Sequence, residues 1–170
     1  MATKKLMCVL FGVLVILAWL LGSVMQAGAE TLNFKFFSRV TRNEVFPIGD
    51  IEGHGVGTQV REGAMIFASG ELGWMKAINS FDNTQVAGAF DQYFIVTFQD
   101  GSTITCHNKG TSTGGSSPTA KWAGEIIQGT GRFQGIKGTA TAEIKFIPPK
   151  DEFGLKGLGE GTFDYTLPSK

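Results

Sequence analysis

The sequence predicts an all-β fold, a single antiparallel β-barrel of about eight strands, with a two-sheet sandwich as the alternative. Three observations lead to this prediction. Short segments alternate apolar and polar residues with the period of two that is typical of strands. Glycines, 24 in all, separate these segments, and 14 phenylalanines supply material for a core. No segment after the N-terminal apolar stretch shows convincing helical periodicity.

The N-terminus predicts a signal peptide over residues 1–29. Lys4 and Lys5 precede an apolar stretch over 6–21, and the small residues of 27–29 follow it. This order is that of a secretory signal, cut here after Ala29. We expect one domain over 30–170 in a secreted or periplasmic location, with no membrane attachment after cleavage. An uncleaved anchor is the alternative, because the apolar stretch is close to the lower limit for spanning a bilayer.

The composition excludes several kinds of partner. The chain holds 15 basic and 15 acidic residues, and it has no basic stripe, so we expect no nucleic-acid partner. Cys8 departs with the signal, which leaves Cys106 without a partner for an intrachain disulfide. The 2 histidines lie far apart in the sequence, and no cluster has metal-ligand spacing, so we expect no metal.

The alternation places the strands along the chain. The segment 31–40 is a clear case, with Phe34 and Phe36 on one face. The run 64–81 contains Gly70 and Gly73, and it is predicted to be one bent strand or two short ones. The other predicted strands are 53–60, the hairpin 90–107, 122–127, 139–147 and 159–167.

The hairpin is predicted to turn at Asp100-Gly101. This dipeptide suits a two-residue type I′ turn, because both central residues need positive φ. The resulting register puts His107 on one face with Phe94. It puts Cys106 on the opposite face.

The segment 128–144 is rich in glycine and raises the question of a phosphate-binding loop. The third glycine comes too late for the dinucleotide fingerprint, and the residues that follow alternate as a strand rather than a helix. The glycines are therefore interpreted as turn and bulge positions. Phe133, the aromatic residue among them, is predicted to be a core aromatic that plugs the end of the barrel or the edge of the sheet.

The same segment resembles the glycine-rich segment of allene oxide cyclase-like and dirigent-like barrels. The residues that carry the resemblance are Gly129, Gly131, Phe133, Gly135 and Gly138. It covers 122–146 well and 90–167 more loosely. The resemblance implies an eight-stranded barrel with an apolar cavity, often a homotrimer, and an activity that steers cyclisation or coupling of hydrophobic substrates without a cofactor.

The chain also departs from these families. It has no Asn-x-Ser/Thr sequon, one cysteine after cleavage, and a secretory signal in place of an organelle transit peptide. A bacterial, exported member of unassigned chemistry fits this pattern best. The glycine motif itself carries no catalytic residue over to this chain.

Two residues are candidates for catalysis. An apolar interior raises the pKa of a carboxylate and makes it usable as an acid or base, and Glu71 shares a face with Met65 and Met75. The alternative is a rim residue that Gly70 turns outward. His107 is a candidate general base or hydrogen-bond donor, or else a histidine at the barrel end.

Four residues are candidates for ligand binding. Trp74 offers a flat surface, and Tyr93 and Tyr165 could direct a hydroxyl into a cavity. Cys106 is the fourth, with a small buried apolar role as its alternative. Each of these aromatic residues has a role in the core as its alternative.

Three functions remain open at this point. The first is a cavity that binds a small hydrophobic molecule, with cofactor-free isomerase or cyclase activity as its enzymatic form. The second is a carrier that binds without catalysis. The third is a structural or assembly barrel filled by its own side chains, since eight strands can close around a solid interior.

Overall fold

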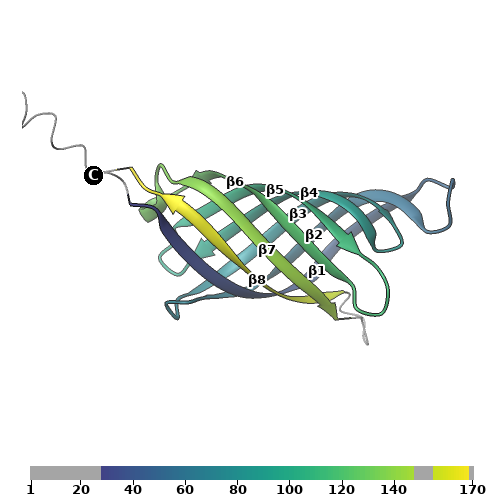
Figure 1. Ribbon diagram of the computed structural model, residues 1–170, viewed down its shortest axis with the longest axis horizontal. Helices are drawn as coiled ribbons and strands as arrows, with labels where there is room; N and C mark the ends of the chain where they lie inside the picture. Colours follow the sequence, from purple (N-terminus) through teal and green to yellow (C-terminus); the bar gives the residue numbers. More distant parts are fainter. Residues whose placement is uncertain (1–27, 148–154, 169–170) are drawn as a thin grey trace, which may run out of the picture.

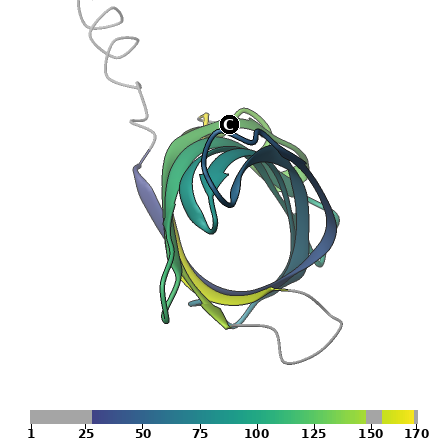
Figure 2. The same ribbon diagram turned by 90° about the vertical axis from the view of Figure 1, so that its right-hand side faces the viewer.

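The computed structural model describes residues 28–147 and 155–168, and these form one closed β-barrel (Figure 1). Each strand pairs antiparallel with the next, and β1 pairs with β8 to close the barrel (Figure 2). The predicted eight-stranded antiparallel barrel is confirmed, and the sandwich is excluded. The strands are β1 Glu30–Pro47, β2 His54–Phe67, β3 Leu72–Thr84, β4 Ala87–Phe98, β5 Thr103–Thr113, β6 Thr119–Gly129, β7 Lys137–Ile147 and β8 Lys156–Thr166.

Every strand of the barrel is hydrogen-bonded to a neighbour on both sides. The described residues contain only one helical turn, the 3-10 turn η1 Gly131–Phe133. No helix among them is long and apolar enough to span a membrane. The predicted signal peptide lies almost entirely outside the described residues, so it stays a prediction.

The first three strands differ from the predicted boundaries. β1 continues to Pro47, and β2 runs without interruption from His54 to Phe67. The run 64–81 is the end of one strand and most of the next. Gly70 supplies the turn between them with φ at 85°, a left-handed conformation that favours glycine.

The predicted register of the β4–β5 hairpin is wrong by one residue. Phe98 donates to the Ser102 carbonyl oxygen at 2.9 Å, so the loop has three residues, and Gly101 takes φ 81° at its end. This is the three-residue turn with a left-handed glycine, not the two-residue type I′ turn. The slip exchanges the two faces of β5. Cys106 therefore pairs with Phe94, and His107 pairs with Tyr93.

The interior at one end of the barrel is packed with aromatic and aliphatic side chains. We call this end, which η1 covers, the η1 end. Phe133 is 4% exposed and lies 4.8 Å from the Phe98 ring, so the predicted plug is confirmed. Phe67 also stacks on Phe98 at 4.8 Å, and Phe34 meets Phe163 at 4.7 Å.

The first part of β8 faces the interior with Gly157, Gly159 and Gly161 instead of side chains, before Phe163 and Tyr165 enter the core. A Cβ at Gly159 would collide with the Phe36 ring, and one at Gly161 would collide with the Phe34 ring. The missing side chains therefore provide the room into which the phenylalanines of β1 pack. The glycines therefore have two roles: some form turns, and others leave room for aromatic rings inside the barrel.

Candidate functional site: an interior cavity

A cavity of about 230 Å³ occupies the other end of the barrel, which we call the cavity end. This end of the barrel faces the viewer in Figure 2. Its floor is apolar and aromatic, and its walls are polar. The apolar part of the lining includes Phe36, Met75, Ala77, Phe90, Phe94, Trp122, Ile144 and Phe146. The polar wall includes Ser38, Asn43, Gln59, Arg61, Asn79, Asn83, Gln85, Gln92 and Ser112. A concave apolar space with a few converging polar groups is typical of a small-molecule site.

The wall contains a ladder of side-chain amides across three neighbouring strands. Asn108 on β5 donates through Nδ2 to Gln92 Oε1 on β4 at 3.2 Å. Gln92 donates through Nε2 to Asn79 Oδ1 on β3 at 2.8 Å. The ladder ends at Asn79, a lining residue whose Nδ2 has no acceptor among the described residues. This leaves a hydrogen-bond donor for a ligand at the cavity wall.

Arg61 on β2, the strand next to β3, is the main polar feature of the adjoining wall, and it is only 5% exposed. Its Nε donates to Ser38 Oγ at 3.3 Å, and its Nη1 donates to Gln59 Oε1 at 3.3 Å. Its Nη2 donates to the Leu155 carbonyl oxygen at 3.1 Å. The guanidinium also lies 5.1 Å from the centre of the Phe146 ring. These contacts hold the planar group in one orientation.

Burial lowers the pKa of Arg61 to about 10, and the group is therefore still protonated at neutral pH. Arg61 is the one ionisable side chain among the described residues that line the cavity. All its hydrogen-bond partners there are neutral groups. A Cβ at Gly157 on β8 would collide with the Ile144 side chain and would approach Arg61 Nη2 to 3.3 Å, so this glycine leaves room for both side chains.

The rim of the cavity carries a histidine clasp. His54 at the start of β2 contacts Asp82 of β3 through Nε2 at 2.9 Å and Asp50 of the β1–β2 connection through Nδ1 at 2.5 Å. The hydrogen bond to Asp82, and then that to Asp50, raises the pKa of His54. The clasp joins the β1–β2 hairpin to the neighbouring strand at the mouth of the cavity.

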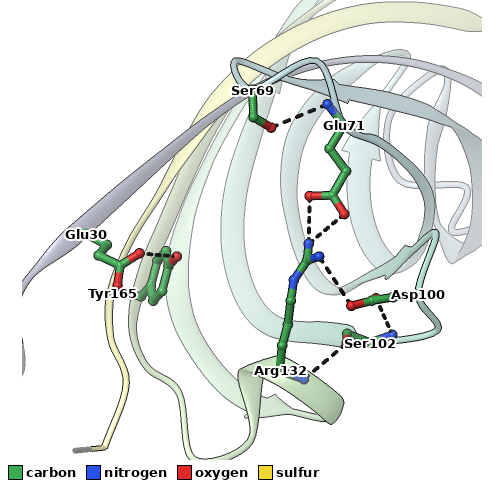
Figure 3. A network of polar contacts seen from close by, with 7 residues as sticks. All are labelled: Glu30, Ser69, Glu71, Asp100, Ser102, Arg132 and Tyr165. Carbon is green, nitrogen blue, oxygen red and sulfur yellow. Dashed lines mark hydrogen bonds and ion pairs between the residues drawn. The ribbon is translucent and has the colours of Figure 1, made fainter.

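Glu71 lies at the η1 end, away from the cavity (Figure 3). Both of its carboxylate oxygens accept from Arg132 Nη2 at 2.7 Å, and Arg132 Nη1 reaches Asp100 at 3.2 Å. The Arg132 guanidinium covers the rings of Phe98 and Phe133 at 4.6 and 4.8 Å. The alternative interpretation of Glu71, as a rim residue after Gly70, describes this position. Its catalytic role stays a prediction, without contact to the cavity.

His107 and Tyr93 lie on the outside of the barrel. The face that was predicted for His107, shared with Phe94, is wrong because of the one-residue slip in the hairpin. His107 Nε2 contacts Asp91 at 2.6 Å, and its ring stacks on Tyr93 at 4.8 Å. His107, the predicted base, and Tyr93, a predicted ligand contact, are therefore neighbours. They lie on the outer surface of the barrel and not in the cavity.

The other three predicted ligand contacts are also outside the cavity lining. Trp74 is 54% exposed on the outer face of β3. Cys106 is fully buried, and burial raises the pKa of its thiol to about 12. Tyr165 belongs to the core at the η1 end and donates to Glu30 Oε2 at 2.8 Å (Figure 3). Burial, and then this bond, raises the pKa of Tyr165 to about 12.

Sequence reasoning missed Arg61 and the amide ladder. The sequence contained a signal for Arg61, because alternate residues of a strand share a face. Phe67, Met65, Gly63 and Arg61 are such alternate residues. The valines of 53–60 drew attention to the opposite face of that segment. The ladder gave no such signal, since isolated Asn and Gln residues in strands usually face solvent.

Among the residues that the structure describes, no group of three or more His, Cys, Asp or Glu side chains is placed to hold a metal ion. The cavity wall itself offers neutral amides, hydroxyls and one guanidinium. The site can therefore donate hydrogen bonds and bind a negative charge.

The described residues form an eight-stranded antiparallel barrel with a cavity at one end, and this fold is similar to that of dirigent proteins. The solved structures that are similar to it include two of pterocarpan synthase dirigent proteins. The chain aligns with PsPTS1 at TM-score 0.53 and 18% identity, over 85% of this chain and all of the other. It aligns with GePTS1 at TM-score 0.51 and 18% identity, over 87% of this chain and 90% of the other. The similarity at this identity establishes the fold.

No protein-family model matches the chain. No curated protein matches it in sequence.

Proposed function

We propose that this protein binds a small, largely apolar molecule in the cavity end of its barrel. The observation that carries the proposal is the division of the interior. Residues such as Phe67 and Phe163 fill the η1 end, whereas a cavity of about 230 Å³ remains between Trp122 and Arg61 at the other end. A barrel with a purely structural role has no need of a polar cavity.

Binding without acid–base catalysis is the form of the function that the cavity favours. Its described lining contains no Asp, Glu, His, Cys, Tyr or Lys side chain. A general acid or base must lie within hydrogen-bond reach of its substrate. An isomerase or cyclase activity would therefore have to depend on positioning and on Arg61, without a titrating partner from the described lining.

Native mass spectrometry of protein purified without denaturant tests the proposal. We expect a stoichiometric small molecule, or an increase in melting temperature with small apolar compounds. Ala77→Leu is the matched variant, because Ala77 is 1% exposed and lines the cavity, so a larger side chain fills the space. We expect it to abolish binding while the barrel still melts cooperatively.

Glu71→Gln is the control variant, since Glu71 lies at the other end of the barrel. We expect its binding to match that of the wild type. Loss of binding in Glu71→Gln but not in Ala77→Leu would place the site at the η1 end and contradict the proposal. An empty protein that no compound stabilises would favour the structural barrel.

We also propose that copies of the chain associate through the outer face of the barrel, as the expected homotrimer requires. Phe37, Trp74 and Leu158 are 39%, 54% and 54% exposed. Phe37 pairs with Leu158, and Trp74 pairs with Ala64 on the strand beside Phe37. Apolar side chains gathered across four strands are typical of a contact surface. A monomer in light scattering at micromolar concentration would contradict this. The exported location remains our proposal as well.

A further inference from the structure

We propose that the ligand is a small apolar monocarboxylate and that Arg61 binds its carboxylate. This inference rests on the proposed function, that the cavity holds a ligand. It assigns to Arg61 the role of a specificity-determining residue. It also divides the site into an anion-binding wall and an aromatic floor.

The first step concerns charge. A buried cation is costly unless a charged or well-bonded partner compensates it. Arg61 is 5% exposed, and its partners Ser38, Gln59 and the Leu155 carbonyl are neutral. The described cavity lining offers no carboxylate. An anionic ligand would provide the missing negative charge inside the cavity itself.

The second step concerns the kind of anion. The guanidinium is a planar fork that binds a carboxylate through two parallel hydrogen bonds. Its three hydrogen bonds leave two of its five N–H groups without a partner among the described residues. No second cation lines the described cavity, as a dianionic phosphate would require. One positive charge and a few amide donors suit a monoanion.

The third step concerns the body of the ligand. The cavity volume of about 230 Å³ lies below the roughly 300–1,000 Å³ of sites for drug-sized ligands, so the ligand is smaller than those. Phe36, Phe94 and Trp122 form its floor. Aromatic rings in offset or edge contact stabilise a second ring beyond simple burial. A single aromatic ring with a short acidic side chain matches both the size and the chemistry.

One competing partner belongs to the chain itself. Asp151 and Glu152 stand in the sequence shortly before Leu155, outside the described residues. If either of them neutralised Arg61 in solution, the arginine would have no charge to offer a ligand. The experiment therefore includes variants of both.

The test compares trans-cinnamate with cinnamamide, a neutral compound of nearly the same shape, by titration calorimetry. We expect the wild type to bind cinnamate about tenfold or more tightly than the amide. Arg61→Met keeps an unbranched apolar side chain without the charged guanidinium, and it should remove this preference while still binding the amide. Arg61→Lys keeps the charge without the fork and should retain only part of the preference.

The possible results separate this inference from the proposed function. Equal binding of acid and amide in the wild type overturns the inference and leaves the proposed function standing. The same holds if neither probe binds and a neutral compound co-purifies. An acidic compound that co-purifies with the wild type but not with Arg61→Met supports the inference. If the protein is empty and no compound, these probes included, binds or stabilises it, both fail.

A double-mutant cycle on the melting temperature tests the competing partner. Arg61→Met is combined with the pair Asp151→Asn and Glu152→Gln. Additive shifts indicate that Arg61 has no carboxylate of its own, as the inference requires. Non-additive shifts, with Arg61→Met destabilising the unliganded protein, would show an internal ion pair and overturn the inference.

Discussion

The two ends of the barrel are built from the same eight strands but are filled in opposite ways. At the η1 end, Phe67, Phe98 and Phe133 pack ring against ring, and Arg132 covers the last two. At the cavity end, Arg61 and amides such as Gln92 take the inward positions. An eight-stranded barrel is narrow enough for side chains to fill it. An open space therefore reflects the residues at inward positions and not the fold.

The difference also separates stability from function. Buried aromatic packing lowers the free energy of the folded state, whereas a buried guanidinium raises it. Natural proteins commonly keep such unfavourable groups where they bind or react. The η1 end therefore contributes most of the stability of the barrel. The cavity end is the part in which we propose that a ligand binds.

The largest expected effect contrasts one phenylalanine from each end. Phe67 is 2% exposed in the core, whereas Phe90 is only partly buried beside the cavity. Phe67→Ala should lower the free energy of unfolding by about 3–5 kcal/mol, because the packed surroundings cannot collapse around the space. Phe90→Ala should cost about 1–2 kcal/mol, since the side chain already borders open volume. Urea denaturation measures both, and equal losses would contradict the contrast.

The next effect has the opposite sign. Arg61→Met should raise the free energy of unfolding of the empty barrel by roughly 1–3 kcal/mol, because it removes a buried charge without a described ionic partner. Ser38 and Gln59, which lose a donor, line the cavity and can bond to water instead. Thermal or urea unfolding without ligand checks the sign. A clear loss of stability would mean that the guanidinium is already compensated in the empty protein.

The smallest effect concerns pH at the mouth of the cavity. Because Asp82, and then Asp50, raises the pKa of His54, the clasp is strongest when His54 is protonated. Its contribution is complete below the unfolded pKa of about 6.5 and is lost as the pH rises through the higher folded value. Hydrogen exchange should show less protection of the Ile48 amide, which bonds to the His54 carbonyl, in mildly alkaline buffer.

Asp82→Asn sharpens this measurement, because it removes the largest cause of the raised pKa. We expect the change in protection to move to lower pH in this variant. A core amide at the η1 end, such as that of Phe98, is the internal reference and should stay protected throughout. If the protection of the Ile48 and Phe98 amides had the same pH dependence, protonation of His54 would not stabilise the mouth of the cavity.

Much of the fold could be predicted from the sequence, because local patterns determine it. Alternation identified the strands, and the glycines of 128–144 identified the turn that carries Phe133. The register of the β4–β5 hairpin could not be predicted in the same way. Asp100-Gly101 fits a two-residue and a three-residue loop alike, and tertiary packing selects between them.

The site was harder to predict, for a related physical reason. A strand has two faces, and which face turns inward depends on the closed barrel rather than on the strand alone. Val56 and Val60 indicated one face of β2, but the inward face carries Gly55, Gln59 and Arg61. Small and polar residues point inward here, and they leave the space and provide the hydrogen-bond donors of the cavity. Hydrophobic patterning is least informative where the interior is not fully hydrophobic.

The pairing of β1 with β8 has a consequence for how the chain reaches this structure. The Tyr165–Glu30 bond joins residues 135 positions apart, and both lie on the strands that close the barrel. Each hairpin can form locally, but the first strand has no permanent neighbour on one side until the last strand has been synthesised. Contacts of such long separation are slow to form, since the entropy of closing the loop must be lost first. Until then, the free edge of β1 can pair with another chain. The final step of folding is therefore also the one that removes the risk of aggregation.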